Sequence, residues 1–88
     1  MAVYIVTYDL NHEQVRPNIV AEVQKTSWAK LSESSYAIST DETDDAVYNR
    51  FSRYLDANDS LYVISLKRPY SGQGLQEVND WLAQHVTW

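Results

Sequence analysis

The segment from Val3 to Leu10 is apolar on both faces of the strand that it would form. Successive side chains of a β-strand point to opposite faces, so Val3 and Ile5 share one face, and Tyr4, Val6, Tyr8 and Leu10 share the other. Such a strand is stable only where both of its faces are covered. Helices can cover one face of the predicted sheet, and a further layer has to cover the second.

Composition narrows the class of protein. Eighty-eight residues with 44% hydrophobic side chains, two glycines and two prolines form one small globular domain. The absence of cysteine removes disulfides, thiolate zinc sites and thiol nucleophiles. No signal peptide precedes the first strand and no apolar run approaches the roughly 20 residues of a membrane span, so we expect a soluble cytoplasmic protein without a membrane partner.

The net charge of −5 bears on nucleic-acid binding. A domain that grips phosphate backbones tightly and without sequence preference is normally basic. The acidic balance weighs against that mode of binding. It leaves open a local basic patch or metal-assisted chemistry on RNA or DNA.

Periodicity and capping signals predict the remaining elements. Pro17 suits the first turn of a helix, and Thr43 is a good N-cap with acids in the following turn. The segment 28–39 is either a hairpin or one bulged strand, because no strong turn dipeptide divides it. The expected elements are a helix at 14–25, strands at 28–31 and 34–39, a helix that begins after Thr43 and stops near Asp56, a strand at 60–66, a turn-rich connector and a terminal helix from 75 onward.

This order predicts an α+β fold, a ferredoxin-like βαββαβ sandwich with a four-stranded antiparallel sheet and a C-terminal helix. Residues 1–68 form the ferredoxin-like domain, and residues 69–88 form a connector and a helix that packs on the same domain. Both main helices lie on one face of the sheet. The apolar second face then predicts either a sheet-to-sheet dimer or cover from the last helix.

Several short motifs, in order and spacing, resemble the small CRISPR-associated ferredoxin-like family, the dimeric centre of the spacer-integration complex. They are Val6-Thr7-Tyr8-Asp9, Lys30, Ser34-Ser35-Tyr36 and Asp59-Ser60-Leu61-Tyr62-Val63. A closer similarity is to the SinR-like bacterial set of that superfamily. It rests on Tyr8-Asp9-Leu10-Asn11, Trp28, Leu55-Asp56-x-Asn58-Asp59 and Trp81-Leu82.

The resemblance implies a role for Asp9. Some members of the family are described as metal-dependent nucleases in which the strand-one Asp of each protomer faces its mate across a two-fold axis. Carried over, Asp9 is the catalytic and metal-binding residue of a homodimer formed through the sheet face, with Mg²⁺ or Mn²⁺ as the cofactor. The alternative is that Asp9 accepts backbone hydrogen bonds in the turn that follows.

Other side chains have two readings each. The basic residues and one strand serine could together form a patch that binds the phosphates of a nucleic acid. Alternatively, they are solvated side chains that pair with nearby acids. The residues of that patch are Lys30, Ser34, Arg50, Arg53, Lys67 and Arg68. His12 is either a general acid or base or a solvated loop residue. The three tryptophans either stack bases or pack, and Gly72-Gln73-Gly74 is read as a turn.

Three functions remain on these grounds. The first is a dimeric, divalent-metal-dependent endonuclease that hydrolyses phosphodiesters of RNA or DNA with Asp9 from both chains. The second is a non-catalytic dimeric scaffold or nucleic-acid adaptor with the same fold. The third is a toxin-type ribonuclease resembling the virulence-associated toxins of the superfamily.

Overall fold

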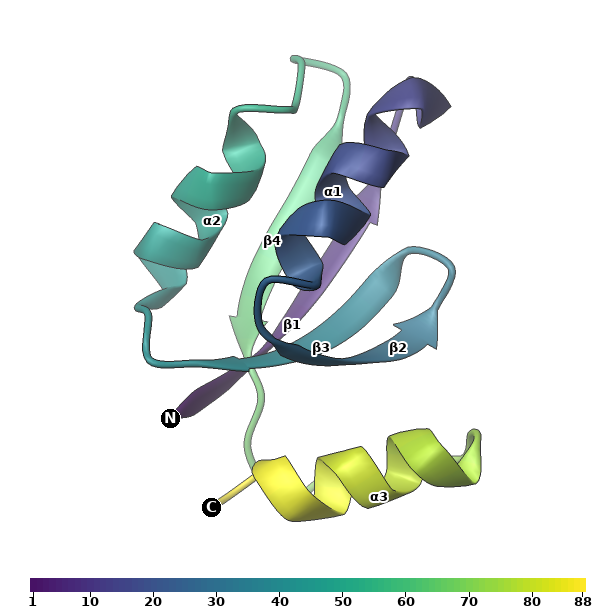
Figure 1. Cartoon of the computed structure of the whole chain (residues 1–88), viewed down its shortest axis with the longest axis vertical. Coiled ribbons are helices and arrows are strands. Elements are labelled where there is room, and N and C mark those ends of the chain that lie inside the picture. Colours follow the sequence, from purple (N-terminus) through teal and green to yellow (C-terminus); the bar gives the residue numbers. More distant parts are fainter.

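A four-stranded antiparallel sheet in the order β2-β3-β1-β4 organises the chain, in a computed structural model that describes residues 1–88 (Figure 1). The strands are β1 (Ala2–Asp9), β2 (Ser27–Ser32), β3 (Ser35–Thr40) and β4 (Ser60–Ser65). The helices are α1 (Arg16–Val23), preceded by the 3-10 turn η1 (Glu13–Val15), α2 (Asp44–Ser52) and α3 (Gln76–His85). The predicted α+β class, the ferredoxin-like order and the C-terminal helix are confirmed.

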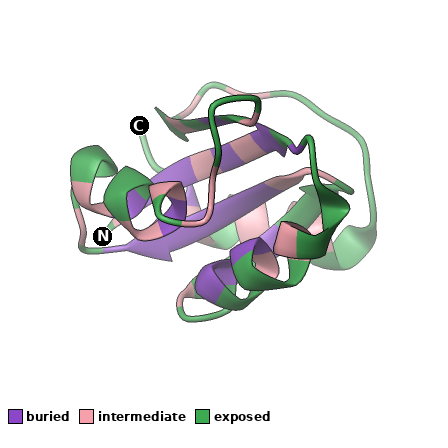
Figure 2. Cartoon of the chain, turned by 90° about the horizontal axis from the view of Figure 1, so that it is seen from above, coloured by how far each residue is buried: buried purple, intermediate pink, exposed green.

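β1 is a central strand, paired on both sides. Ile5, for example, lies opposite Ala37 of β3 and Ile64 of β4. The even-numbered side chains of β1 enter the core beneath α1 and α2, where burial is concentrated (Figure 2). The core cluster consists of Tyr4, Val6, Tyr8, Leu10, Ile19, Val23, Tyr36, Ile38, Val47, Phe51 and Leu61.

The segment 28–39 is a hairpin and not one bulged strand. β2 pairs with β3 through Ala29 opposite Ala37, and Glu33-Ser34 forms the turn between them. A register shift between Lys30 and Ser32 adds a local irregularity to β2. The hairpin is therefore the correct alternative, and its first strand carries a local irregularity.

Helix boundaries differ from the sequence prediction at α1. Gln14 and Val15 lie in η1, and the α-helix begins only at Arg16, with Pro17 in its first turn. Proline has no N–H to donate to the carbonyl four residues earlier, so the preceding residues close as a tighter turn. α2 begins as predicted, since the Thr43 hydroxyl accepts a hydrogen bond of 3.2 Å from the Ala46 N–H.

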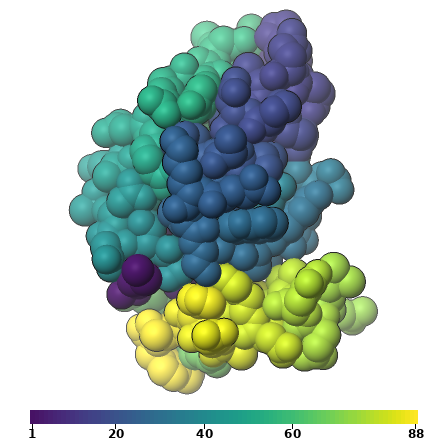
Figure 3. All heavy atoms as spheres, in the orientation of Figure 1, coloured from purple at the N-terminus to yellow at the C-terminus, as the bar shows by residue number.

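The second face of the sheet is covered in part by α3, which lies beside β2 and apart from the helix layer (Figure 3). Trp81 Nε1 donates to the Ser27 hydroxyl at 3.1 Å. The Arg68 guanidinium donates to the carbonyls of Val86 and Ala83 at 2.9 and 3.0 Å, which ties the end of α3 to the exit of β4.

The cover is incomplete. Val3, Ala29 and Ala37 are buried on this face, whereas Tyr62 and Ile64 of β4 are 64% and 52% exposed. β4 and the Asp9 end of β1 are therefore the open part of this face.

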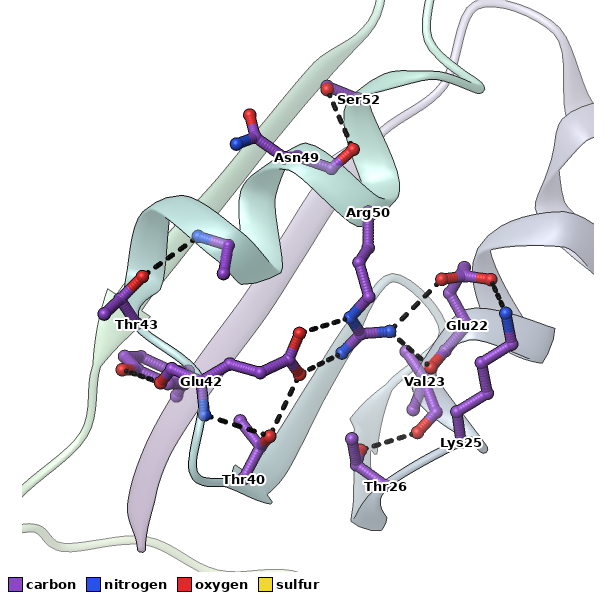
Figure 4. Close-up of polar contacts among 12 residues, drawn as sticks. Glu22, Val23, Lys25, Thr26, Thr40, Glu42, Thr43, Asn49, Arg50 and Ser52 are labelled. Atoms are coloured by element: carbon purple, nitrogen blue, oxygen red, sulfur yellow. Dashed lines mark hydrogen bonds and ion pairs between the residues drawn. The ribbon is translucent and has the colours of Figure 1, made fainter.

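An ion-pair network joins the helix layer (Figure 4). Arg50 of α2 donates to both carboxylate oxygens of Glu42 at 2.9 Å and to Glu22 Oε1 of α1 at 3.2 Å. Glu22 is only 1% exposed, and it also accepts from Lys25 and Arg53. Burial by itself would raise the pKa of Glu22, but the hydrogen bonds from Lys25 and Arg50 outweigh it and hold that pKa below its ordinary value.

Arg50→Ala is expected to lower the free energy of unfolding by about 1.5–3 kcal/mol, because Glu22 and Glu42 both lose charge-assisted hydrogen bonds while Glu22 keeps those from Lys25 and Arg53. The measurement is urea denaturation at pH 7. Arg53→Ala is the matched control, since its side chain is 59% exposed. That control should lose less than about 1 kcal/mol. Equal losses in the two variants would contradict the assignment.

Stability should fall in acid through Glu22. Its pKa is lower in the folded chain than in the unfolded chain, so its contribution is present above the unfolded value of about 4.3 and disappears as pH falls through the folded pKa. Glu22→Gln should flatten the pH profile of the unfolding free energy below that value. Glu33→Gln, whose side chain is 86% exposed, should leave the profile as in the wild type.

Candidate functional site

Asp9 is the last residue of β1 and lies opposite Ser60, the first residue of β4. Its odd position places it on the open second face, with Ile5 and Thr7, and it is exposed. The Asp9 carboxylate takes part in none of the side-chain hydrogen bonds or ion pairs of the chain. A rigid strand thus presents an unpaired carboxylate to the surface.

The turn-forming role considered for Asp9 is performed by Asp59. One oxygen of the Asp59 carboxylate accepts from the Asn11 N–H at 2.6 Å, and the other accepts from the Asp56 N–H at 2.9 Å. These backbone hydrogen bonds, from Asp56 first and Asn11 second, lower the pKa of Asp59. The carboxylate therefore joins the loop after β1 to the loop before β4, and Asp9 is left without a structural partner.

His12 lies close to Asp56. Its Nε2 atom is 3.9 Å from a carboxylate oxygen of Asp56 and 3.3 Å from the Asn11 side-chain nitrogen. The ring is exposed, in agreement with a solvated loop residue. No contact joins His12 to the Asp9 carboxylate.

Two hydroxyl groups share the open face with Asp9, one step of the face alternation earlier along β1. The hydroxyls of Thr7 and Ser35 are 2.9 Å apart, on paired residues of β1 and β3. Carboxylate and hydroxyl oxygens suit a hard cation such as Mg²⁺. One chain contains no group of three or more His, Asp or Glu side chains placed to hold a metal ion.

Arg16 is a residue that the sequence analysis did not select. Its guanidinium donates to the Glu33 carbonyl, to the Ser34 hydroxyl at 3.3 Å and to the Tyr8 hydroxyl at 3.4 Å. It thereby fastens the turn of the β2–β3 hairpin to α1. Its two-pronged ion pair with Glu13 is local, but no sequence pattern marks the bonds to the hairpin turn, because Glu33 and Ser34 lie 17 and 18 residues further along the chain.

The predicted phosphate-binding residues lie in three separate places. Lys30 is on the hairpin and pairs with Glu33 at 3.3 Å, near Ser34. Arg50 and Arg53 belong to the network around Glu22, and Lys67 and Arg68 follow β4 on the side of α3. The fold does not bring these residues together into one patch. Phosphate binding by any of them would therefore take place at a separate, smaller site.

The tryptophans mostly pack. Trp28 meets Tyr36 edge-on at 5.9 Å between ring centroids, and Trp81 stacks on His85 at 4.2 Å. Trp88 is 81% exposed at the end of the chain. Trp28 and Trp81 therefore serve the packing role that was one of the two readings.

A groove of about 810 Å³ lies between the second sheet face and the connector with α3. Its walls are mainly apolar on the sheet and helix sides, and Gly72 and Gly74 belong to the connector wall. The apolar lining residues are Ile5, Leu31, Leu66, Tyr70, Leu75, Val78 and Leu82.

No family model, no curated protein and no solved structure matches this chain. None of its helices has the length and apolar character needed to traverse a lipid bilayer.

Asp59→Ala is expected to free the two loops that its carboxylate joins. The amides of Asn11 and Asp56 should then exchange hydrogen faster, because each loses its acceptor. The measurement is amide hydrogen exchange followed by NMR. Asp9→Ala is the matched control and should leave both amides at the wild-type rate. Faster exchange in the Asp9 variant would contradict the division of roles between the two acids.

Proposed function

We propose that the protein is a homodimeric, divalent-metal-dependent endonuclease in which Asp9 from both protomers forms the catalytic centre. The observation that carries the proposal is the unpaired, exposed Asp9 carboxylate at the end of the central strand, on the open sheet face. The resemblance of Val6-Thr7-Tyr8-Asp9 to the strand-ending motif of the CRISPR-associated family supports it. The resemblance of Tyr8-Asp9-Leu10-Asn11 and Trp81-Leu82 to the SinR-like bacterial set adds to this support.

The dimer surface in this proposal is the part of the second face that α3 leaves open. Tyr62 and Ile64 are exposed there, and Ile5 is half-buried beside them. Exposed apolar side chains that share one face favour burial against an equivalent face. A two-fold axis near the end of β1 would bring two copies of Asp9 together.

Two carboxylates at close range repel each other, so their association is coupled to a cation or a shared proton. Bound Mg²⁺ or Mn²⁺ would supply an activated water for attack on phosphorus. The chain's own part is to hold the two Asp9 carboxylates rigidly, because each ends a strand paired on both sides. Asp59 holds the adjoining loops without using the Asp9 oxygens.

A non-catalytic scaffold or adaptor is the second candidate. It is favoured by the net charge of −5 and by the separation of the basic residues, which supplies no continuous track for a nucleic-acid backbone. In that case the open face would still mediate dimerisation, and Asp9 would have no catalytic role.

The proposed function is tested by incubating purified protein with labelled RNA and DNA in Mg²⁺ or Mn²⁺. Asp9→Asn should lower the cleavage rate by about 100-fold or more, since it removes charge from the metal ligand in both protomers. Asp41→Asn, an exposed acid after β3, is the matched control and should cleave at the wild-type rate.

Cleavage that survives Asp9→Asn would contradict the metal mechanism. A wild type that dimerises but neither cleaves nor shifts nucleic acid would identify the scaffold. A strictly monomeric mass at tens of micromolar, about the range of a weak dimer, would refute the dimer and with it the carboxylate pair.

A further inference from the structure

The two edges of the sheet are built differently. β2 is protected against pairing with another strand by the charged Lys30, by the register shift between Lys30 and Ser32, and by α3 alongside it. These are the devices by which natural sheets protect an edge. β4 is the other edge strand, and it carries neither a charge nor a register shift, although α2 packs beside it (Figure 1).

β4 has the sequence Ser-Leu-Tyr-Val-Ile-Ser, without a charge, a proline or a register shift. The Leu66 N–H donates to the Val3 carbonyl at 2.8 Å, which turns the backbone of Leu66 toward β1. Hydrogen-bonding direction alternates along an antiparallel strand, so the N–H and C=O groups of Leu61, Val63 and Ser65 point outward from the sheet. This row of backbone groups is a template for one more strand.

A pocket of about 340 Å³ lies beside this edge, between the first turns of α2 and β4. Its walls combine two carboxylates, two tyrosines and two aliphatic side chains. They are Asp44, Asp45, Tyr48, Leu61, Tyr62 and Val63. Tyr48 and Tyr62 are 44% and 64% exposed, and neither acid takes part in an ion pair of the chain.

We propose that β4 binds an extended, basic peptide segment of another protein, which adds to the sheet as a fifth strand. Main-chain hydrogen bonds to Leu61, Val63 and Ser65 would supply the pairing. Side chains of an added strand alternate between the two faces, so every second residue would point to the pocket beside α2. An arginine or lysine there would lie beside the carboxylates of Asp44 and Asp45, which favour a cation over an apolar side chain.

Charge argues for a heterologous segment over a second copy of the chain. Pairing β4 with β4 of another copy around a two-fold axis would bring two acidic pockets next to each other. Like charges placed together oppose that arrangement, whereas a basic strand neutralises the pocket.

The inference does not use the Asp9 carboxylate of the proposed nuclease, although Tyr62 belongs both to this pocket and to the proposed dimer surface. Asp9→Asn should therefore bind the peptide as the wild type does. Loss of nuclease activity and loss of peptide binding can then be told apart in the same preparation.

The test uses an extended peptide of about eight residues, the length of a typical strand with short ends, in which arginine alternates with valine. Its binding to the full chain is followed by fluorescence anisotropy, with the amides of Leu61, Val63 and Ser65 observed by NMR. We expect slower hydrogen exchange at these amides on binding. Asp44→Asn with Asp45→Asn should weaken binding about tenfold through the loss of two partly exposed charge contacts.

Matched controls separate charge from strand addition. Glu77→Gln with Asp80→Asn on α3 changes the net charge equally and should bind within about twofold of the wild type. A peptide with glutamate in place of arginine should bind at least about tenfold more weakly. N-methylation of alternate amides along one edge of the basic peptide should abolish binding, and methylation along the opposite edge should not.

Three results would overturn the proposal. Equal binding of the arginine and glutamate peptides would remove the charge argument. Binding that leaves the three β4 amides unprotected would remove strand addition. Protection of those amides that rises with protein concentration, without peptide, would identify a second copy as the occupant.

Discussion

The pairing of β1 on both sides is the constraint from which the rest of the structure follows. Its even-numbered side chains build the core under α1 and α2, and its odd-numbered side chains face α3 or the surface. A central strand has no freedom to slip, because a shift by one residue would exchange these two sets. The same constraint holds Asp9 at a defined point on the open face.

The polar residues divide into those that hold the fold and those left available. Arg50 and Arg16 are engaged in holding helices and the hairpin turn, and Asp59 in holding two loops together. Asp9, Asp44 and Asp45 have no such partners. The unpaired carboxylates named here therefore lie in two places. One is the end of β1, and the other is beside the outer edge of β4.

Much of the fold could be predicted because its signals are local. The alternation along β1, the Thr43 cap and the apolar spacing of α2 each lie within one element. Local signals did not decide between a hairpin and one bulged strand at 28–39. Glu33-Ser34 is not a strong turn dipeptide, and the turn is held by Arg16 from another element. Likewise, no local signal marks Glu22 as buried, because its partner Arg50 lies 28 residues further along the chain.

The sequence by itself determined the sheet, the two apolar faces and an acid at the end of the first strand. Side-chain alternation and strand ends depend on residues that are neighbours in the chain. Only the tertiary structure decided which acid holds the turn, how far α3 covers the second face and which sheet edge stays unpaired. Those outcomes depend on residues that are distant in the chain and meet only after packing. The physical reason is that hydrogen bonds and ion pairs such as Asp59 with Asn11 are non-local, and local patterning carries no record of them.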